Sequence, residues 1–278
     1  MGYFFVVAIG LWVLFFVQYS DTTESIVWSE SINQIQDNKS NSVENIVANS
    51  TENSVWSSDV IFTGAEQRNP VENIISVSTG MIVHDVPFTS QAPFGAWWNI
   101  IFQEGCEEAA TIMAIAWATG KTEISPEDAN AQILAIADYE QEEFWTHMHA
   151  SIYDISTTMT EYLWFSDHTI VENISKAELI QYLRDWHIVM VPTSGRALKN
   201  SYYTPPGPRN HIILIIGYDP DKSEFITNDS GTKNGALYRY NEDLLFSAIG
   251  YYATSATDAG SPIDTTRKSG IVISKVAS

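Results

Sequence analysis

Residues 211–229, HIILIIGYDPDKSEFITND, constrain the fold more than any other stretch, because their pattern predicts a β-hairpin. An apolar run leads into the turn residues Asp219–Lys222, and a second apolar run follows them. A loop of three or five residues would set His211 directly opposite Asp229, whereas a four-residue loop would favour Asn228. Residues directly opposite each other have Cβ atoms about 4.5–5.5 Å apart. The hairpin therefore predicts an imidazole beside a carboxylate on an antiparallel sheet.

Helical patterns precede this hairpin in the chain. The segment GCEEAATIMAIAWATG at 105–120 predicts a helix that begins at its cysteine and ends at Gly120. Ser125, followed by a proline, begins a second helix, and Ser175 forms a capping box with Glu178 at the start of a third. Helices first and strands second favour a segregated α+β domain. Further strands are predicted at 81–87, 187–192 and 236–240.

The composition limits the class of protein. With 278 residues, 45% of them hydrophobic, the chain is long enough for one well-buried domain with extensions. The net charge of −20 repels phosphate backbones, so we expect no nucleic-acid partner. The single cysteine, Cys106, excludes a disulfide framework within the chain and a zinc site built from CxxC pairs. It is therefore either a buried structural thiol or a reactive one.

An unbroken apolar run, Tyr3–Val17, lies near the N-terminus. Its 15 residues are long for the core of a signal peptide and short for a spanning helix, which needs about 20. No basic segment precedes the run and no cleavage pattern of small residues follows it, so we expect residues 1–20 to be a transmembrane anchor or an uncleaved signal. This predicts a single-pass protein of the cell membrane with the rest of the chain outside the cytoplasm; secretion is the alternative.

Residues 21–80 are rich in Ser, Asn, Thr and Glu and contain a duplication with a period of 28 residues. V-W-S and V-E-N-I each occur once in both copies. Two copies are too few for a stacked repeat, and their polar composition argues against a packed core. We interpret the segment as a disordered, flexible acidic spacer, with a paired binding module as the alternative. A domain at 81–253 and a tail or last strand at 254–278 are expected to follow.

Cys106 stands at a predicted helix N-terminus, where the helix dipole favours the thiolate. It also lies on the apolar stripe of that helix, so we expect it to face the strands packed there. A thiol still needs a base near neutral pH, and His211 is the best placed of the six histidines, because it opens a strand after the loop YYTPPGPRN. His147 and His149 could share a metal ion, but no third ligand is evident nearby, so we favour exposed polar residues.

Several motifs together resemble a known family. They are VPFTSQ at 86–91, GCEEAA at 105–110, GRALKN at 195–200, PPGPxxH ending at His211, GYD at 217–219 and FITNDSGT at 225–232. In this order they resemble the papain-like cysteine peptidases, and more closely bacterial proteins similar to the bacteriocin-processing, or double-glycine leader, peptidases. The resemblance implies a papain-like fold, in which an N-terminal helix bearing the cysteine packs on an antiparallel sheet bearing the histidine and the aspartate.

The resemblance also implies roles for individual residues. Cys106 would be the nucleophile, His211 the general base and Asp229 the residue that orients the imidazole. Gln91 would donate to the oxyanion beside the Cys106 backbone N–H, with Gln103 as the runner-up on spacing. Neither a metal ion nor an organic cofactor is expected.

Departures from the family pattern bear on these expectations. Glu107 and Glu108 stand where Gly-Pro commonly follows the cysteine, and Ser230 replaces a proline. We expect Glu107 to point into solvent and Glu108 to lie near the rim of the cleft as a candidate substrate contact. The full double-glycine enzymes are fused to a transporter, and no bundle of spanning helices is predicted here. Removal of bacteriocin leaders is therefore not the expected task.

These observations together predict a membrane-tethered, extracytoplasmic cysteine hydrolase that cleaves peptide or amide bonds in a peptide or protein substrate. A non-catalytic peptide-binding module on the same fold is one alternative. An acyl transferase or amidase acting on cell-wall peptides is another, because it shares the acyl-enzyme chemistry. The sequence leaves the substrate specificity and the oligomeric state open. The aromatic residues expected to line the cleft are Trp97, Trp98, Tyr202 and Tyr203.

Overall fold

The computed structural model describes residues 80–253 and 262–276, which belong to one compact unit, Ile74–Ser278. The predicted membrane segment and the predicted spacer up to residue 79 lie outside the described residues. Within the described part of the chain, no helix is both long enough and apolar enough to cross a membrane.

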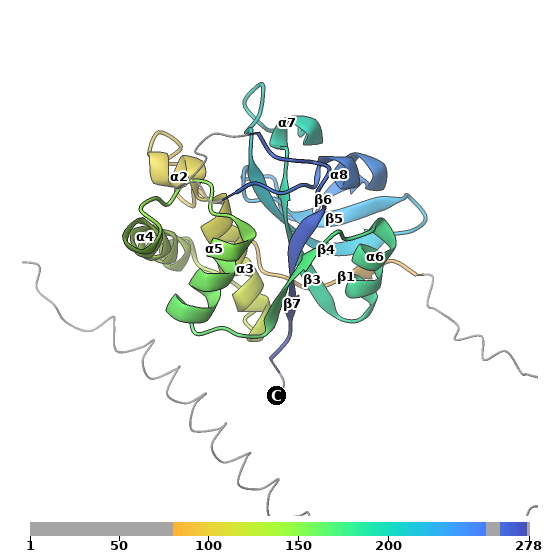
Figure 1. The fold of residues 1–278 in the computed structure, drawn as a ribbon, viewed down its shortest axis with the longest axis horizontal. Coiled ribbons are helices and arrows are strands. Elements are labelled where there is room, and N and C mark those ends of the chain that lie inside the picture. Colours follow the sequence, from red (N-terminus) through yellow and green to blue (C-terminus); the bar gives the residue numbers. More distant parts are fainter. Residues whose placement is uncertain (1–79, 254–261, 277–278) are drawn as a thin grey trace, which may run out of the picture. The chain divides into compact units, whose positions relative to one another are not determined.

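The described chain combines helices with one antiparallel sheet, as Figure 1 shows, and the predicted α+β class is confirmed. The helices are α2 (Ile100–Glu104), α3 (Cys106–Ala118), α4 (Pro126–Glu143), α5 (Ile152–Thr157), α6 (Lys176–Arg184), α7 (Gly195–Leu198) and α8 (Glu242–Ala248), and a short π-helix, η1 (Thr158–Tyr162), follows α5. The strands are β1 (Ile82–Val83), β2 (His168–Glu172), β3 (His187–Thr193), β4 (His211–Asp219), β5 (Glu224–Asn228), β6 (Tyr238–Asn241) and β7 (Ser269–Ser274).

The strand order across the sheet is β2-β7-β3-β4-β5-β6. β1 pairs with Gly217 and Tyr218 of β4, beyond the part of β4 that pairs with β3. Only Ile82–Val83 of the strand predicted at 81–87 pairs in this way. β7 comes from the last part of the chain and lies between β2 and β3, so the sheet of the domain extends past residue 253.

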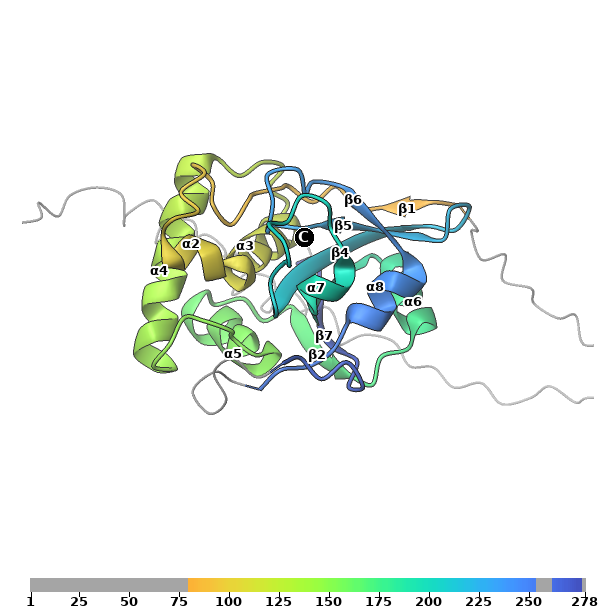
Figure 2. The ribbon, with the colours of Figure 1, turned by 90° about the horizontal axis from the view of Figure 1, so that it is seen from above.

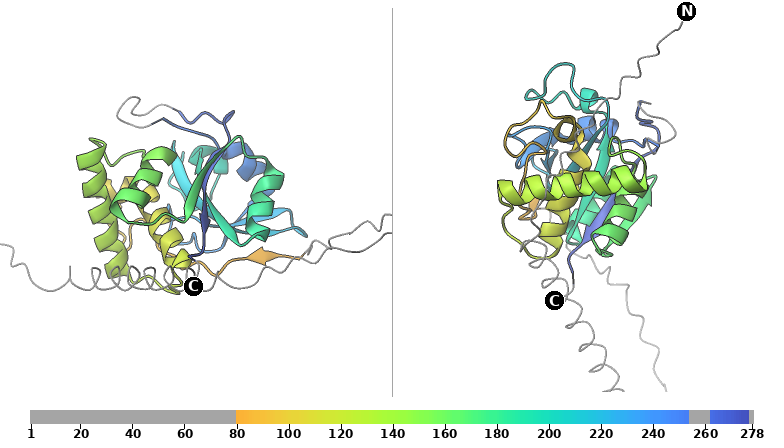
Figure 3. Two further views of the ribbon diagram at one scale, coloured as in Figure 1. Left: turned by 60° about the horizontal axis from the view of Figure 1, so that its bottom comes forward. Right: turned by 90° about the vertical axis from the view of Figure 1, so that its left-hand side faces the viewer.

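The central strand β4 is buried on both faces, because helices lie on both sides of the sheet (Figures 2 and 3). Successive side chains of a strand point to opposite faces. Ile212, Leu214 and Ile216 accordingly pack with α3 and α5, whereas Ile213 and Ile215 pack with α6, α7 and α8. A nine-residue strand of this kind fixes both helical layers relative to each other.

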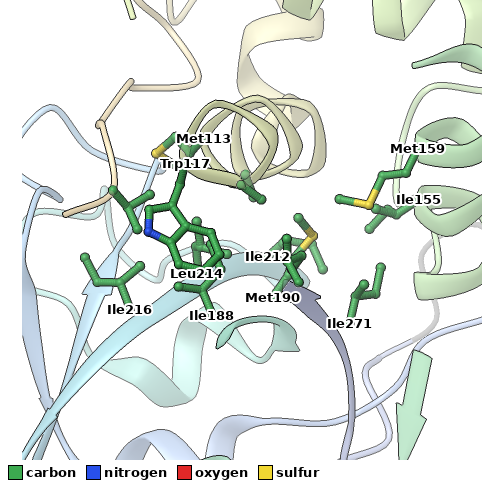
Figure 4. Packing of buried hydrophobic residues seen from close by; sticks show 14 of the residues in the cluster. Met113, Trp117, Ile155, Met159, Ile188, Met190, Ile212, Leu214, Ile216 and Ile271 are labelled. Carbon is green, nitrogen blue, oxygen red and sulfur yellow. The ribbon is translucent and has the colours of Figure 1, made fainter. Parts of the chain in front are cut away.

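α3 lies between the sheet and α4 (Figure 2). Trp117 of α3 points toward the sheet residues in Figure 4, and Met113 belongs to the same buried cluster. On another side of the helix, Ile112 packs with Ile133 of α4. Every residue of α3 except Ile115 is buried, so the helix has almost no face in contact with solvent.

The predicted helix starts at Ser125 and Ser175 are confirmed. Ser125 Oγ accepts a hydrogen bond from Asp128 N over 3.0 Å at the start of α4. At the start of α6, Ser175 Oγ accepts from Glu178 N, and Glu178 Oε2 accepts in return from Ser175 N over 2.8 Å. These contacts satisfy N–H groups that a helix start otherwise leaves unpaired.

The hairpin of β4 and β5 is confirmed, but its loop and register differ from the prediction. Asp219 pairs with Glu224, so four residues form the loop. A β-bulge then shifts the register between Ile215 and Gly217, because β4 has one extra residue there. The sequence pattern carries no clear mark of this extra residue.

As a result, His211 does not lie directly opposite Asp229 or Asn228, and this part of the prediction is wrong. Leu214 pairs with Asn228. Continued by one residue, the register sets Asp229 opposite Ile213, two residues from His211 on the same face of the strand. The two side chains are therefore diagonal neighbours, a separation that long side chains can still bridge.

The close approach of β1 to β4 leads to a first prediction, on Gly217→Ala. A Cβ at this position would clash with Ile82 O and would lie 3.1 Å from Val83 Cα, and backbone atoms cannot rotate out of the way. We expect the substitution to lower the free energy of unfolding by about 1–3 kcal/mol. Urea denaturation measures this change in the free energy of unfolding. An unchanged urea midpoint would show that β1 is not held against β4.

Candidate active site

Cys106 is the first residue of α3, as predicted, and is buried. Gly105 precedes it without a side-chain cap, so the sulfur lies at an open helix start. The Ile212 N–H at the start of β4 donates to Cys106 Sγ over 3.4 Å. The thiol is therefore next to the strand end at which His211 begins β4.

His211 and Asp229 form a buried pair. His211 Nε2 lies 2.8 Å from Asp229 Oδ1, and the two side chains are 2% and 0% exposed. An ionised carboxylate only accepts hydrogen bonds, so Nε2 carries the proton in this contact. Nδ1 is then the basic nitrogen of the ring.

Four further groups donate to the Asp229 carboxylate. Burial by itself would raise the pKa of Asp229, but the charge of the imidazole and the hydrogen bonds from the imidazole and two tyrosines outweigh burial and hold the pKa at about 2. Asp229 is therefore ionised at neutral pH. The four donors are Gly231 N to Oδ1 (3.1 Å), and Asn200 Nδ2 (3.0 Å), Tyr203 OH (2.6 Å) and Tyr240 OH (2.6 Å) to Oδ2.

Sequence reasoning did not identify Asn200, Tyr203 and Tyr240 as partners of Asp229. The available signals were indirect: Asn200 ends the GRALKN motif, and Tyr240 lies in a predicted strand. Tyr203, which we expect to line the cleft, borders a hollow of about 160 Å³ beside α7. Its ring also meets the His211 ring edge-on, with 5.5 Å between the centroids. Tyr203 thus contacts both members of the buried pair.

Glu107 is buried beside the thiol, contrary to the prediction that it points into solvent. Cys106 Sγ donates to Glu107 Oε2 over 2.9 Å, and Tyr252 OH donates to Oε1 over 3.2 Å. The prediction fails because α3 is enclosed on nearly all sides. Burial raises the pKa of Cys106, and the charge and hydrogen bond of Glu107 raise it further. The thiolate expected from the helix dipole is therefore not favoured here.

Glu108 is fully buried, and the prediction that it lies at the rim of the cleft is wrong as well. Neither carboxylate oxygen has a hydrogen-bond partner in the described structure. Burial raises the pKa of Glu108, and the charges of Glu140 and Glu107 add to this effect. Glu140 of α4 is also buried, and burial raises its pKa in the same way. Three acidic side chains thus share the buried space around the first turn of α3.

Gln91 and Gln103, the two candidates for the oxyanion donor, both lie near the start of α3. Gln91 Nε2 donates to Phe102 O over 3.0 Å and to Gln103 O over 2.8 Å. Gln103 Nε2 donates to Trp97 O over 2.6 Å. Both hydrogens of the Gln91 amide are engaged, so donation to an oxyanion requires one of these bonds to be exchanged. In this arrangement Gln91 holds α2 close to the thiol.

Some of the expected contacts are not made in this arrangement. Within the described residues, no hydrogen bond joins Cys106 Sγ to His211. Asn228, the alternative to Asp229, donates to Val86 O over 3.1 Å and accepts from Leu237 N over 3.2 Å. It therefore supports the backbone around β5 and does not orient the imidazole.

The loops beside α2 carry exposed tryptophans, whereas His147 and His149, predicted to be exposed, are half-buried. Trp97 and Trp98, which we expect to line the cleft, are exposed, Trp98 much more so than Trp97. His149 Nδ1 lies 3.9 Å from Glu104 Oε2 at the end of α2. Across residues 80–253 and 262–276, no group of three or more histidine, cysteine or acidic side chains is arranged to hold a metal ion.

Comparisons with known proteins concern the same part of the chain. A family model described as the Peptidase_C39 like family matches residues 83–258. Among solved structures, a Bacillus anthracis protein provisionally described as a C39-like peptidase matches with a TM-score of 0.43 and 14% sequence identity, over 71% of this chain and 99% of that chain. No curated protein matches the chain significantly. The matched segment includes Gln91, Cys106, His211 and Asp229.

The unpartnered carboxyl group of Glu108 leads to a prediction on pH and stability. Because its pKa is raised in the folded state, its contribution to stability is complete below the unfolded pKa of about 4.3 and is lost as the pH rises through the folded value. We expect the free energy of unfolding of Glu108→Gln to fall less than that of wild type as the pH rises. At neutral pH it should be about 1–3 kcal/mol higher than that of wild type. Urea denaturation at several pH values measures it.

Glu123→Gln is the matched control, because Glu123 is exposed and the same charge is removed. Its stability should follow the wild-type curve. If Glu108→Gln also follows the wild-type curve at every pH, the buried carboxyl group is not a destabilising feature of the fold.

Proposed function

The chain belongs to the Peptidase_C39-like family, and from this premise we propose that it is a cysteine peptidase whose catalytic residues are Cys106, His211 and Asp229. The observation that carries the proposal is the buried pair of His211 and Asp229, joined over 2.8 Å at the strand end where Ile212 N contacts Cys106 Sγ. A nucleophile, a base and the group that orients the base thus come from three separate segments of one domain.

In the first half of the reaction, Cys106 Sγ attacks the carbonyl carbon of the substrate while its proton passes to His211 Nδ1. The ionised Asp229 keeps the other ring proton on Nε2 and stabilises the imidazolium that forms. The imidazolium then gives its proton to the leaving amine, the bond between carbon and nitrogen breaks, and a thioester remains on the cysteine.

In the second half, a water molecule loses a proton to His211 Nδ1 and attacks the thioester. The carbonyl carbon forms a bond to the water oxygen and releases the sulfur, which recovers the proton from the imidazolium. The acid product leaves and the enzyme returns to its starting state. Neither a metal ion nor an organic cofactor takes part in this proposal.

The proposed donors to the oxyanion are the Cys106 backbone N–H at the start of α3 and the Nε2 of Gln91. Gln91 is favoured because it is buried beside the segment that leads into the thiol. Gln103 is the alternative, since it lies three residues before the cysteine. Substrate binding would have to exchange one hydrogen bond of the Gln91 amide, whereas the Gln103 amide, in the described structure, donates only to Trp97 O and retains a second hydrogen.

We further propose that Tyr3–Val17 tethers the domain to the cell membrane, with the domain outside the cytoplasm. The support for this location is the apolar run and the acidic segment that follows it. Fractionation of cells that express the full chain, with and without residues 1–20, tests the tether separately from catalysis.

A non-catalytic peptide-binding module is the second candidate, and one observation favours it. The Cys106 thiol donates to Glu107, and burial raises its pKa, so the resting sulfur is a weak nucleophile. In this alternative, the buried pair and its tyrosines form a rigid polar wall beside a bound peptide.

Cys106→Ala separates the two candidates. We expect the wild-type chain to cleave members of an unbiased peptide library and Cys106→Ala to cleave none, because the nucleophile is lost. Asp229→Asn should lower kcat/KM by about 10²–10⁴-fold, because the imidazole loses the partner that fixes its proton. Mass spectrometry of the digests measures both effects.

The two candidates give opposite outcomes in this digest. Cleavage at the wild-type rate by Cys106→Ala would refute the proposed chemistry. A wild-type chain that binds library peptides equally well with or without the thiol, and cleaves none, would support the binding module.

A parallel comparison assigns the oxyanion donor. Gln91→Ala should lower kcat by about 10²–10³-fold, which is the typical effect of removing one such donor, while Gln103→Ala changes it little. The reverse order of effects, measured on the same peptide, would assign the role to Gln103.

A further inference from the structure

One buried acidic residue, Glu107, contacts the nucleophile directly and has no part in the mechanism above. Its Oε2 is 2.9 Å from Cys106 Sγ, and its Oε1 is 3.2 Å from Tyr252 OH. Both neighbours belong to the apolar cluster between α3 and the sheet, and Glu107 itself is 2% exposed. The contact is therefore part of the packed interior and not a transient meeting of surface side chains.

The hydrogen bond between Sγ and Oε2 requires one shared proton, because neither an ionised thiol nor an ionised carboxylate can donate. With ordinary pKa values of about 8.5 for a thiol and about 4.3 for a glutamate, this proton belongs on the sulfur. An ionised Glu107 therefore stabilises a neutral thiol. In the described structure, the thiol hydrogen is directed to Glu107 and no hydrogen bond joins the sulfur to His211.

We propose that Glu107 is a further acid–base residue of the active centre, which sets the protonation state of Cys106. While ionised, Glu107 accepts the thiol hydrogen and keeps the sulfur neutral. When Glu107 takes up one proton from solvent, the thiol loses this acceptor and its own proton passes to His211 Nδ1. The new Glu107 O–H then donates to the thiolate. This role rests on the proposed cysteine peptidase activity, and it makes that activity depend on pH.

The neighbouring carboxyl groups make the uptake of this proton favourable. Glu108 follows directly in α3, is fully buried, and has no hydrogen-bond partner for either oxygen in the described structure. Glu140 of α4 is buried nearby and interacts electrostatically with Glu107 and with Glu108. Ionised carboxylates that share a buried space without a cation destabilise one another, so at least one of them takes up a proton readily.

Burial raises the pKa of Glu107, and the charge of Glu104 adds to this, while the hydrogen bond from the thiol and the charge of His149 oppose it. The balance leaves the carboxyl group easier to protonate than a glutamate in water. The titratable groups around Glu107 and its thiol partner are Cys106 and Glu108 of α3, Glu104 of α2, Glu140 of α4, His149 before α5, Tyr252 after α8 and His211 of β4.

Titration of the thiol tests the proposal without any substrate. In the full chain, the ultraviolet absorbance of the thiolate is followed against pH for wild type and for Glu107→Gln. We expect the wild-type thiol to titrate above the ordinary value of about 8.5. Glu107→Gln should lower the thiol pKa by at least about one unit, a tenfold rise in thiolate at a given lower pH.

Two further variants serve as controls. Glu104→Gln removes an equal charge nearby without touching the sulfur, and it should shift the thiol pKa by less than half as much. Tyr252→Phe keeps the charge of Glu107 but removes a donor to Oε1. The carboxylate then accepts the thiol hydrogen more strongly, so the thiol pKa should rise, opposite in direction to Glu107→Gln.

The proposal is overturned by a wild-type thiol that loses its proton, as the pH is raised, at a value well below about 8.5, or by equal shifts in Glu107→Gln and Glu104→Gln. The titration of the wild-type thiol can overturn the proposal by itself, even if Glu107→Gln does not fold. If a cleaved peptide is in hand, kcat/KM of wild type should rise as the pH falls through the titration of Glu107, and this rise should be absent in Glu107→Gln. Failure of the proposed function shows separately, as cleavage that survives Cys106→Ala.

Discussion

The packing of α3 against β4 is the interaction on which the candidate active site depends. It brings the sulfur of Cys106 within 3.4 Å of the Ile212 N–H, although more than one hundred residues separate them in the chain. Apolar side chains on alternate positions of β4 hold α3 on one face and α6 to α8 on the other. Burial of this helix also removes the first turn of α3 from water, which decides the protonation of every acidic group there.

Two acidic residues near the thiol illustrate how partners control charge in a buried environment. Asp229 accepts five hydrogen bonds, so it stays ionised in spite of its burial and has a pKa of about 2. Glu108 is equally buried and has no partner for its oxygens in the described structure, so burial raises its pKa. Glu107 lies between these extremes, with the thiol and Tyr252 as its donors.

The sequence predicted the α+β class, the start of α3 at Cys106, the caps at Ser125 and Ser175, and the proximity of His211 to Asp229. These features depend on local patterns and on motifs. The bulge between Ile215 and Gly217 could not be predicted, because the apolar run of β4 is continuous and gives no sign of an extra residue. The burial of Glu107 and Glu108 could not be predicted either, because it depends on α4 and on the segment containing Tyr252, which close over a face that the helical pattern alone assigns to solvent.

The central claim is that Cys106, His211 and Asp229 form one working centre, in which the Cys106 thiol must stop donating to Glu107 and give its proton to His211 in order to act. A crystal structure of the full chain with a peptide aldehyde tests it most directly. We expect a covalent bond between Sγ and the aldehyde carbon, His211 Nδ1 within hydrogen-bond distance of the new centre, and Nε2 still paired with Asp229. An aldehyde bound elsewhere, or a covalent adduct with His211 Nδ1 out of reach of the new centre, would contradict the account.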